Sequence, residues 1–112
     1  MLVERNYGNP LDPKLEKLKK ELDLHICSLM RHENKDYEPL ITSDASQQNI
    51  RISMINRNSY LYIEDLELPN ETDFLHIYCL NRNIQFSETP YYLQLTTNAA
   101  YELLAVLKLE GY

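Results

Sequence analysis

The sequence predicts an α+β domain in which an antiparallel sheet is covered on one face by two helices. Three observations lead to this fold class. Apolar residues recur at three- and four-residue steps in residues 13–32 and again in residues 98–109, which is typical of amphipathic helices. From residue 50 to residue 96, short apolar runs are separated by Asn and Pro, which favours an antiparallel β-meander of four to five strands. We expect one domain over residues 1–112, with a flexible N-terminus at residues 1–11.

The N-terminal helix is expected over residues 13–32. Asp12 can accept hydrogen bonds as the N-cap, and Pro13 fits the first helical position because that position needs no N–H donor. One face of this helix is apolar and consists of Leu15, Leu18, Leu22, Ile26 and Leu29. The charged residues on the opposite face largely cancel one another, so we expect a solvated helix that packs on one side.

Residues 33–49 show no clear period. Pro39 and the many Ser, Asp and Gln residues indicate a long loop, with room for a short strand at residues 40–42. A loop of this length is unusual in a compact domain, which makes it a functional candidate in its own right.

The strands are expected where apolar and polar residues alternate. The clearest is residues 50–54, and two Asn-Arg-Asn triplets provide tight turns because Asn tolerates positive φ. The further strands are expected to begin near residue 60, to span residues 74–80, to lie around residues 84 and 86, and to span residues 91–96.

The C-terminal helix is expected over residues 98–109. Thr97 or Asn98 can cap its N-terminus, Lys108 suits its last turn, and Gly111 suits the position after its C-terminus. Its apolar face consists of Ala100, Leu103, Leu104 and Leu107.

The net charge of −6 lies entirely in the second half of the chain. Residues 1–57 contain nine basic and nine acidic residues, whereas residues 58–112 contain two basic and eight acidic ones. Five acids fall within ten positions and are called here the acidic segment: Glu64, Asp65, Glu67, Glu71 and Asp73. Such a cluster attracts cationic partners and repels nucleic acid and anionic membranes, so we expect neither of the latter as a direct partner.

Several function classes lack their motifs. The chain has two glycines and no phosphate-binding G-x-G-x-x-G or G-K-[ST] string. No apolar run approaches the roughly 20 residues of a membrane-spanning helix, and the N-terminus lacks the pattern of a secretory signal. With only Cys27 and Cys79, we expect a cytoplasmic protein with reduced thiols and no cofactor.

The histidines and cysteines suggest no chemistry. His25 and His32 are two helical turns or about 10 Å apart, which is too far to share a metal ion directly, and His76 is expected to point from its strand toward solvent or a partner. Cys79 is expected to be buried, and Cys27 has no evident basic neighbour to lower its pKa. We therefore expect no metal site and no catalytic residue.

Three tyrosines complete the predicted partner surface. Tyr60, Tyr62 and Tyr78 fall on strand faces opposite the aliphatic residues, and Tyr gives a large contact area at low entropic cost. This aromatic face is either exposed for a partner or covered as a second side of the core; the sequence leaves both open.

These features favour a binding protein over an enzyme. The leading hypothesis is a small acidic protein that inhibits or neutralises a basic protein partner, in the manner of immunity proteins or phage-borne inhibitors, a comparison by class alone. The alternative is a secretion-type chaperone or homodimeric adaptor that holds a client segment. Two weaker hypotheses are an enzyme with a histidine brought beside a carboxylate, and mimicry of nucleic acid by spaced carboxylates.

Overall fold

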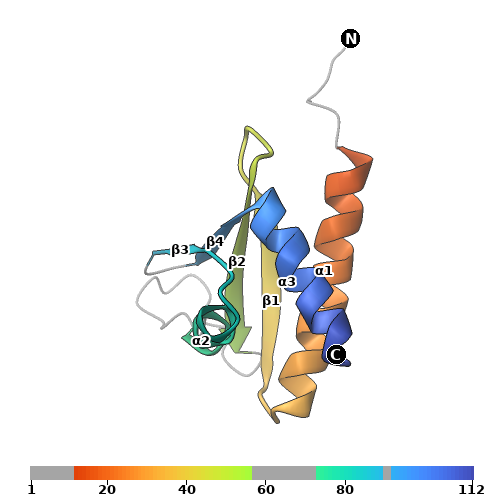
Figure 1. The fold of residues 1–112 in the computed structure, drawn as a ribbon, viewed down its shortest axis with the longest axis vertical. Coiled ribbons are helices and arrows are strands. Elements are labelled where there is room, and N and C mark those ends of the chain that lie inside the picture. Colours follow the sequence, from red (N-terminus) through yellow and green to blue (C-terminus); the bar gives the residue numbers. More distant parts are fainter. Residues whose placement is uncertain (1–11, 57–72, 90–91) are drawn as a thin grey trace.

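The computed structural model describes residues 12–56, 73–89 and 92–112 of the chain (Figure 1). Within these residues the fold is α+β, as predicted: three helices accompany an antiparallel sheet with the strand order β1-β2-β4-β3. The elements in chain order are α1 (Pro13–His32), β1 (Tyr37–Ser43), β2 (Asn49–Asn56), α2 (Asp73–Asn81), β3 (Ser87–Glu88), β4 (Leu93–Thr96) and α3 (Thr97–Leu109). Because β3 has only two residues, β1, β2 and β4 form most of the sheet.

Helix α1 has the predicted bounds and the predicted cap. The Asp12 carboxylate accepts a hydrogen bond from the Lys14 backbone N–H at 2.9 Å, and Pro13 occupies the first turn. All five residues of the predicted apolar face are buried. The helix ends where Asn34 adopts a positive φ of 57° and the Lys35 N–H bonds to the Met30 carbonyl oxygen.

The long loop predicted over residues 33–49 is wrong in part, because residues 37–43 form strand β1, which extends to both sides of the short strand expected at residues 40–42. β1 pairs antiparallel with β2 from Tyr37 opposite Asn56 to Ser43 opposite Ile50. β1 lies at the edge of the sheet, where Pro39 is tolerated. The Asp44 carboxylate closes the connecting turn by accepting hydrogen bonds from the following residues.

The strand predicted at residues 74–80 is instead helix α2. Apolar and aromatic residues fill this segment almost without interruption, so its sequence fits a strand period and a helix period equally well. The buried residues are Leu75, Tyr78 and Cys79, which have the three- and four-residue spacing of a helix, while Ile77 is exposed. The second Asn-Arg-Asn triplet begins at Asn81, the last residue of this helix, and Asn83 has a positive φ of 60°.

The described strands therefore do not form the predicted meander, because their order in the sheet is β1-β2-β4-β3. Residues 84–86 lie outside any strand, and β3 follows them at Ser87–Glu88. β4 lies within the strand expected over residues 91–96, but it pairs with both β2 and β3, so the helical connection through α2 leads to the far edge of the sheet. The strand expected near residue 60 lies outside the described residues, as does the flexible N-terminus expected at residues 1–11.

Helices α1 and α3 pack on the sheet and on each other (Figure 1). α1 lies mainly over β1, whereas α3 lies over β2 and β4. The Thr96 hydroxyl caps α3 by accepting from the Ala99 N–H at 3.1 Å, one or two residues before the expected cap. The predicted apolar face of α3 is buried, and a Lys108–Glu21 ion pair of 2.8 Å joins the two helices at the surface. None of the helices in the described part of the chain is long and apolar enough to cross a membrane.

Candidate binding site

Most of the predicted partner surface lies outside the described residues. This applies to Tyr60, Tyr62, Glu64, Asp65, Glu67 and Glu71, which all fall within residues 57–72. Asp73 is the first residue of α2, so the acidic segment leads directly into that helix. The partner contacts predicted for these residues stay predictions.

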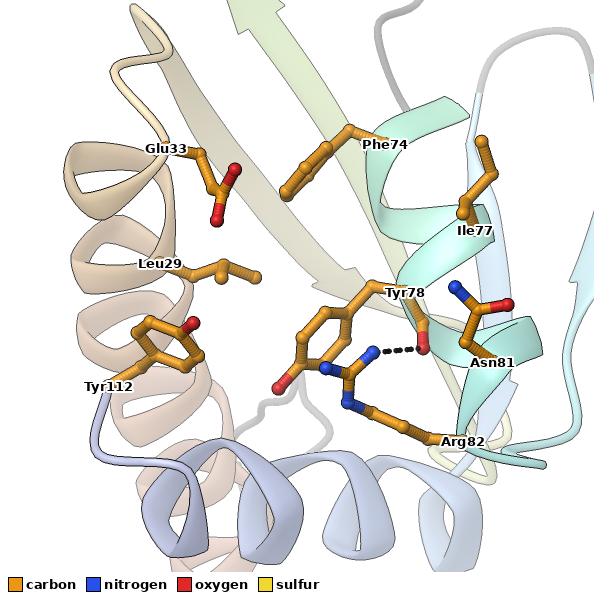
Figure 2. Close-up of a pocket in the computed structure, with 8 residues that line it drawn as sticks. All are labelled: Leu29, Glu33, Phe74, Ile77, Tyr78, Asn81, Arg82 and Tyr112. Atoms are coloured by element: carbon orange, nitrogen blue, oxygen red, sulfur yellow. Dashed lines mark hydrogen bonds between the residues drawn. The ribbon is translucent and has the colours of Figure 1, made fainter.

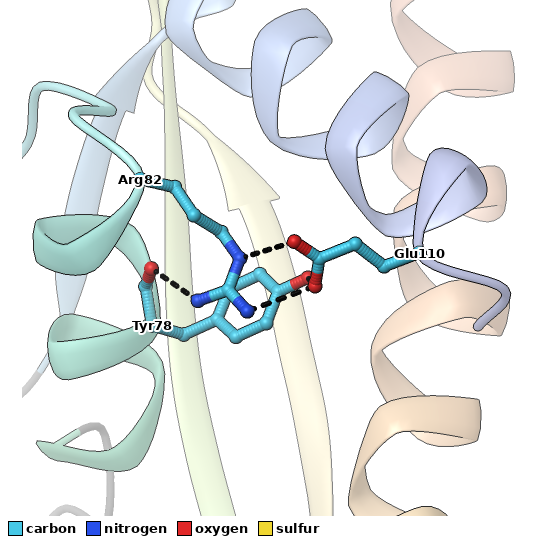
Figure 3. Close-up of polar contacts among 3 residues, drawn as sticks. All are labelled: Tyr78, Arg82 and Glu110. Carbon is cyan, nitrogen blue, oxygen red and sulfur yellow. Dashed lines mark hydrogen bonds and ion pairs between the residues drawn. The ribbon is translucent and has the colours of Figure 1, made fainter.

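Tyr78 lies on helix α2 and not on a strand face. Its side chain packs in the hydrophobic core and is only 6% exposed, so a partner could reach little of its surface. The Tyr78 hydroxyl donates a hydrogen bond of 2.7 Å to Oε1 of Glu110, which follows α3 (Figure 3). Burial, and then this hydrogen bond to a carboxylate, raise the pKa of Tyr78, so the hydroxyl stays protonated as a donor.

Arg82 joins Tyr78 and Glu110 into one cluster that connects α2 with the end of α3. Its Nε and Nη2 atoms donate to the two Glu110 carboxylate oxygens at 2.8 Å each, and its Nη1 donates to the Tyr78 carbonyl oxygen at 3.1 Å. The guanidinium also stacks on the Tyr78 ring, 3.5 Å from its centroid (Figure 3). The hydrogen bonds from Arg82 and then from Tyr78 lower the pKa of Glu110. The positive charge of Arg82 is thus matched by a bidentate carboxylate.

A cavity of about 170 Å³ lies between α1 and α2 beside this cluster (Figure 2). Its lining combines apolar and aromatic side chains with charged and amide groups, and its surface is about equally polar and apolar. The residues that line it are Leu29, Glu33, Phe74, Ile77, Tyr78, Asn81, Arg82 and Tyr112. They come from the end of α1 and the residue after it, from α2 and the residue after it, and from Tyr112, so segments far apart in sequence form this cavity.

Tyr112 is held in the cavity wall by three contacts. Its N–H bonds to the Leu107 carbonyl oxygen at 3.0 Å, which the positive φ of Gly111 permits. The Nδ1 atom of His25 bonds to its main-chain oxygen, and the His32 ring meets its ring edge-on at 5.2 Å between centroids. His25 and His32, which are two helical turns apart, thus both contact the same residue, Tyr112.

Other side chains around α2 also have partners. The Lys35 ammonium lies 5.1 Å from the centroid of Phe74. His76, predicted to point from a strand toward solvent or a partner, lies instead on α2 and meets the Phe86 ring edge-on at 4.5 Å.

The cysteines do not have the environment of nucleophiles. Burial raises the pKa of Cys79 to about 12, and burial together with a hydrogen bond to Asp23 raises that of Cys27 to about 11. The thiolate population at neutral pH is therefore small. Among the described residues, no group of three or more His, Cys, Asp or Glu side chains could hold a metal ion.

Comparison with protein-family models, with curated proteins and with solved structures finds no match for this chain.

Proposed function

We propose that this chain is an acidic binding protein that inhibits or neutralises a basic protein partner. The proposal includes no catalytic step, no cofactor and no direct contact with nucleic acid or membrane. It rests on two adjacent features: the acidic segment and helix α2, which begins at the last acid of that segment.

The observation that carries the proposal is the exposed apolar face of α2. Ile77 is 55% exposed and Leu80 is 60% exposed, although the same helix buries Leu75, Tyr78 and Cys79. A helix that is apolar on nearly all sides normally lies inside a protein. Ile77 and Leu80 thus present apolar contact surface one and two helical turns after Asp73, the last residue of the acidic segment.

These two features suit successive stages of association. The field of the acidic segment would accelerate encounter with a basic surface, and this effect weakens with salt. Desolvated contact with Ile77 and Leu80 would then supply affinity, as apolar anchors do in protein interfaces. Tyr60 and Tyr62 remain proposed anchors, whereas Tyr78 has too little exposed surface for this role.

The proposal is tested by affinity capture from an extract of the cells that make the protein, at low and at moderate salt. Two variants carry the same change in net charge: Glu64→Lys with Glu67→Lys alters the acidic segment, and Asp23→Lys with Glu102→Lys alters exposed residues on α1 and α3. We expect one folded basic protein to be captured by the wild type and by the second variant, and to be lost from the first variant.

A third variant separates the affinity that apolar contacts supply from the acceleration of encounter by charge. Ile77→Ser with Leu80→Ser should speed dissociation of the captured protein while leaving the salt dependence of its association rate unchanged. Capture that is equal in both charge variants and insensitive to salt would show that the acidic segment does not recognise the partner.

A chaperone or homodimeric adaptor is the second proposal. It is favoured by two strongly exposed leucines outside α2, Leu24 on α1 and Leu109 at the end of α3. Such a protein would sediment as a dimer and would capture an unstructured client segment regardless of the two charge variants.

A further inference from the structure

We propose that the cavity between α1 and α2 takes a single basic side chain, lysine or arginine, of the partner protein. This inference rests on the proposed function, because it names the group of the basic partner that docks beside α2.

The α1 side of the cavity offers a carboxylate and a hydroxyl, and the Tyr112 hydroxyl interacts electrostatically with Arg82. The Glu33 carboxylate points into the gap between the two helices, and the Tyr112 hydroxyl lies on the same side (Figure 2). Within residues 12–56, 73–89 and 92–112, neither oxygen group forms a hydrogen bond or ion pair. A positively charged head group with several N–H donors is the chemical complement of these acceptors.

The remaining walls suit an aliphatic stem. Leu29, Phe74 and Ile77 supply apolar surface, and lysine and arginine bury their methylene stems on such surface while the charge stays near water. The cavity volume of about 170 Å³ is close to the roughly 150 Å³ of an engineered apolar cavity that binds benzene, so one side chain fits.

The charges nearby decide where the head group would lie. Arg82 also lines the cavity, but its guanidinium is already paired with Glu110 and stacked on Tyr78. The Lys35 ammonium lies over the Phe74 ring. A guest cation is therefore directed toward Glu33 and Tyr112, and only its stem toward Phe74.

The inference is tested without the partner, by titrating the ¹⁵N-labelled full chain with short peptides. One probe is a glycine peptide with a central arginine; its matched control has citrulline at that position, which keeps the shape and removes the charge. We expect saturable shifts of the backbone amides of Glu33, Ile77 and Asn81, with citrulline binding at least about fivefold more weakly. A second pair, lysine against acetyl-lysine, tests the same point.

Two variants locate the charge that is recognised. Glu33→Gln keeps the size of the side chain and should weaken arginine-peptide binding about two- to fivefold, as expected for a partly exposed ion pair. Glu102→Gln removes the same charge from the exposed face of α3 and should leave the affinity unchanged.

Equal affinity for arginine and citrulline would instead identify a site for neutral side chains and overturn the inference. Unchanged affinity in Glu33→Gln, or no saturable shift around the cavity, would also overturn it. These outcomes leave the proposed function standing, because that function is tested by charge reversal at Glu64 and Glu67 in the capture experiment.

Discussion

Replacing Tyr78 with Phe removes one hydrogen bond from the cluster that joins α2 to the end of α3. The hydroxyl donates to a charged carboxylate at 2.7 Å, and such bonds contribute about 1.5–3 kcal/mol when the acceptor is well shielded. The Glu110 side chain is 34% exposed, so water replaces part of the lost interaction. We therefore expect the free energy of unfolding to fall by about 1 kcal/mol, and Tm by roughly 4 °C for a domain of this size.

A double-mutant cycle in urea isolates this contribution. Tyr78→Phe should cost about 1 kcal/mol in the wild-type chain and close to nothing in a Glu110→Ala background, where its acceptor is missing. A cost that is the same in both backgrounds would refute the reasoning, because it would place the effect in ring packing and not in the hydrogen bond.

The same cycle should depend on pH in a known direction. The pKa of Glu110 is lowered in the folded state, so the unfolded chain binds more protons at acidic pH. The stabilisation by this carboxylate is complete above its ordinary pKa of 4.5 and is lost as the pH falls through the lower folded-state pKa. The coupling between Tyr78 and Glu110 should shrink over that window.

Three further predictions concern stability and reactivity. Leu103→Ala, at a fully buried position on α3, should lower the free energy of unfolding by about 2–5 kcal/mol in urea titrations; a loss below about 1 kcal/mol would mean that α3 does not close the core. The hydrogen bond from the Asn49 side chain is the main cause that lowers the pKa of Asp44 to about 2. The Asp44 carboxylate should therefore stabilise the β1–β2 turn from neutral pH down to its ordinary pKa of 3.8, and this stabilisation should disappear as the pH approaches 2. Between pH 3.8 and 2, the Tm should fall in the wild type and fall less in Asp44→Ala. Cys79 should resist an aromatic disulfide reagent until the chain unfolds, since it is fully buried and its pKa is about 12; rapid labelling of two thiols in the native protein would contradict this.

The candidate site was largely beyond sequence-based prediction. Of the two predicted partner residues that the structure describes, Tyr78 lines the cavity and Asp73 does not, and Tyr78 does so from a helix and through a buried ring. No local sequence motif marks Glu33, Arg82 and Tyr112. They become neighbours only in the folded chain, where the ends of α1, α2 and α3 come together around the cavity. The seven-residue spacing places His25 and His32 on the same side of α1. That both contact Tyr112 follows from the packing of α3 against α1, which the spacing does not predict.

The sequence by itself determined the parts whose period is unambiguous. The bounds, cap and apolar face of α1, the apolar face of α3, and the inward residues of β2 all follow from local spacing, since an amphipathic segment has one arrangement that buries its apolar side. The charge asymmetry is likewise a property of the chain before it folds.

Only the tertiary structure decided the rest. α2 is apolar on nearly every side, so contacts with the core select helix over strand. β1 is a strand because β2 pairs with it along seven residues, despite Pro39 and its weak alternation. The cavity exists because α1, α2 and Tyr112 enclose space between them, and long-range packing of that kind has no counterpart in local spacing.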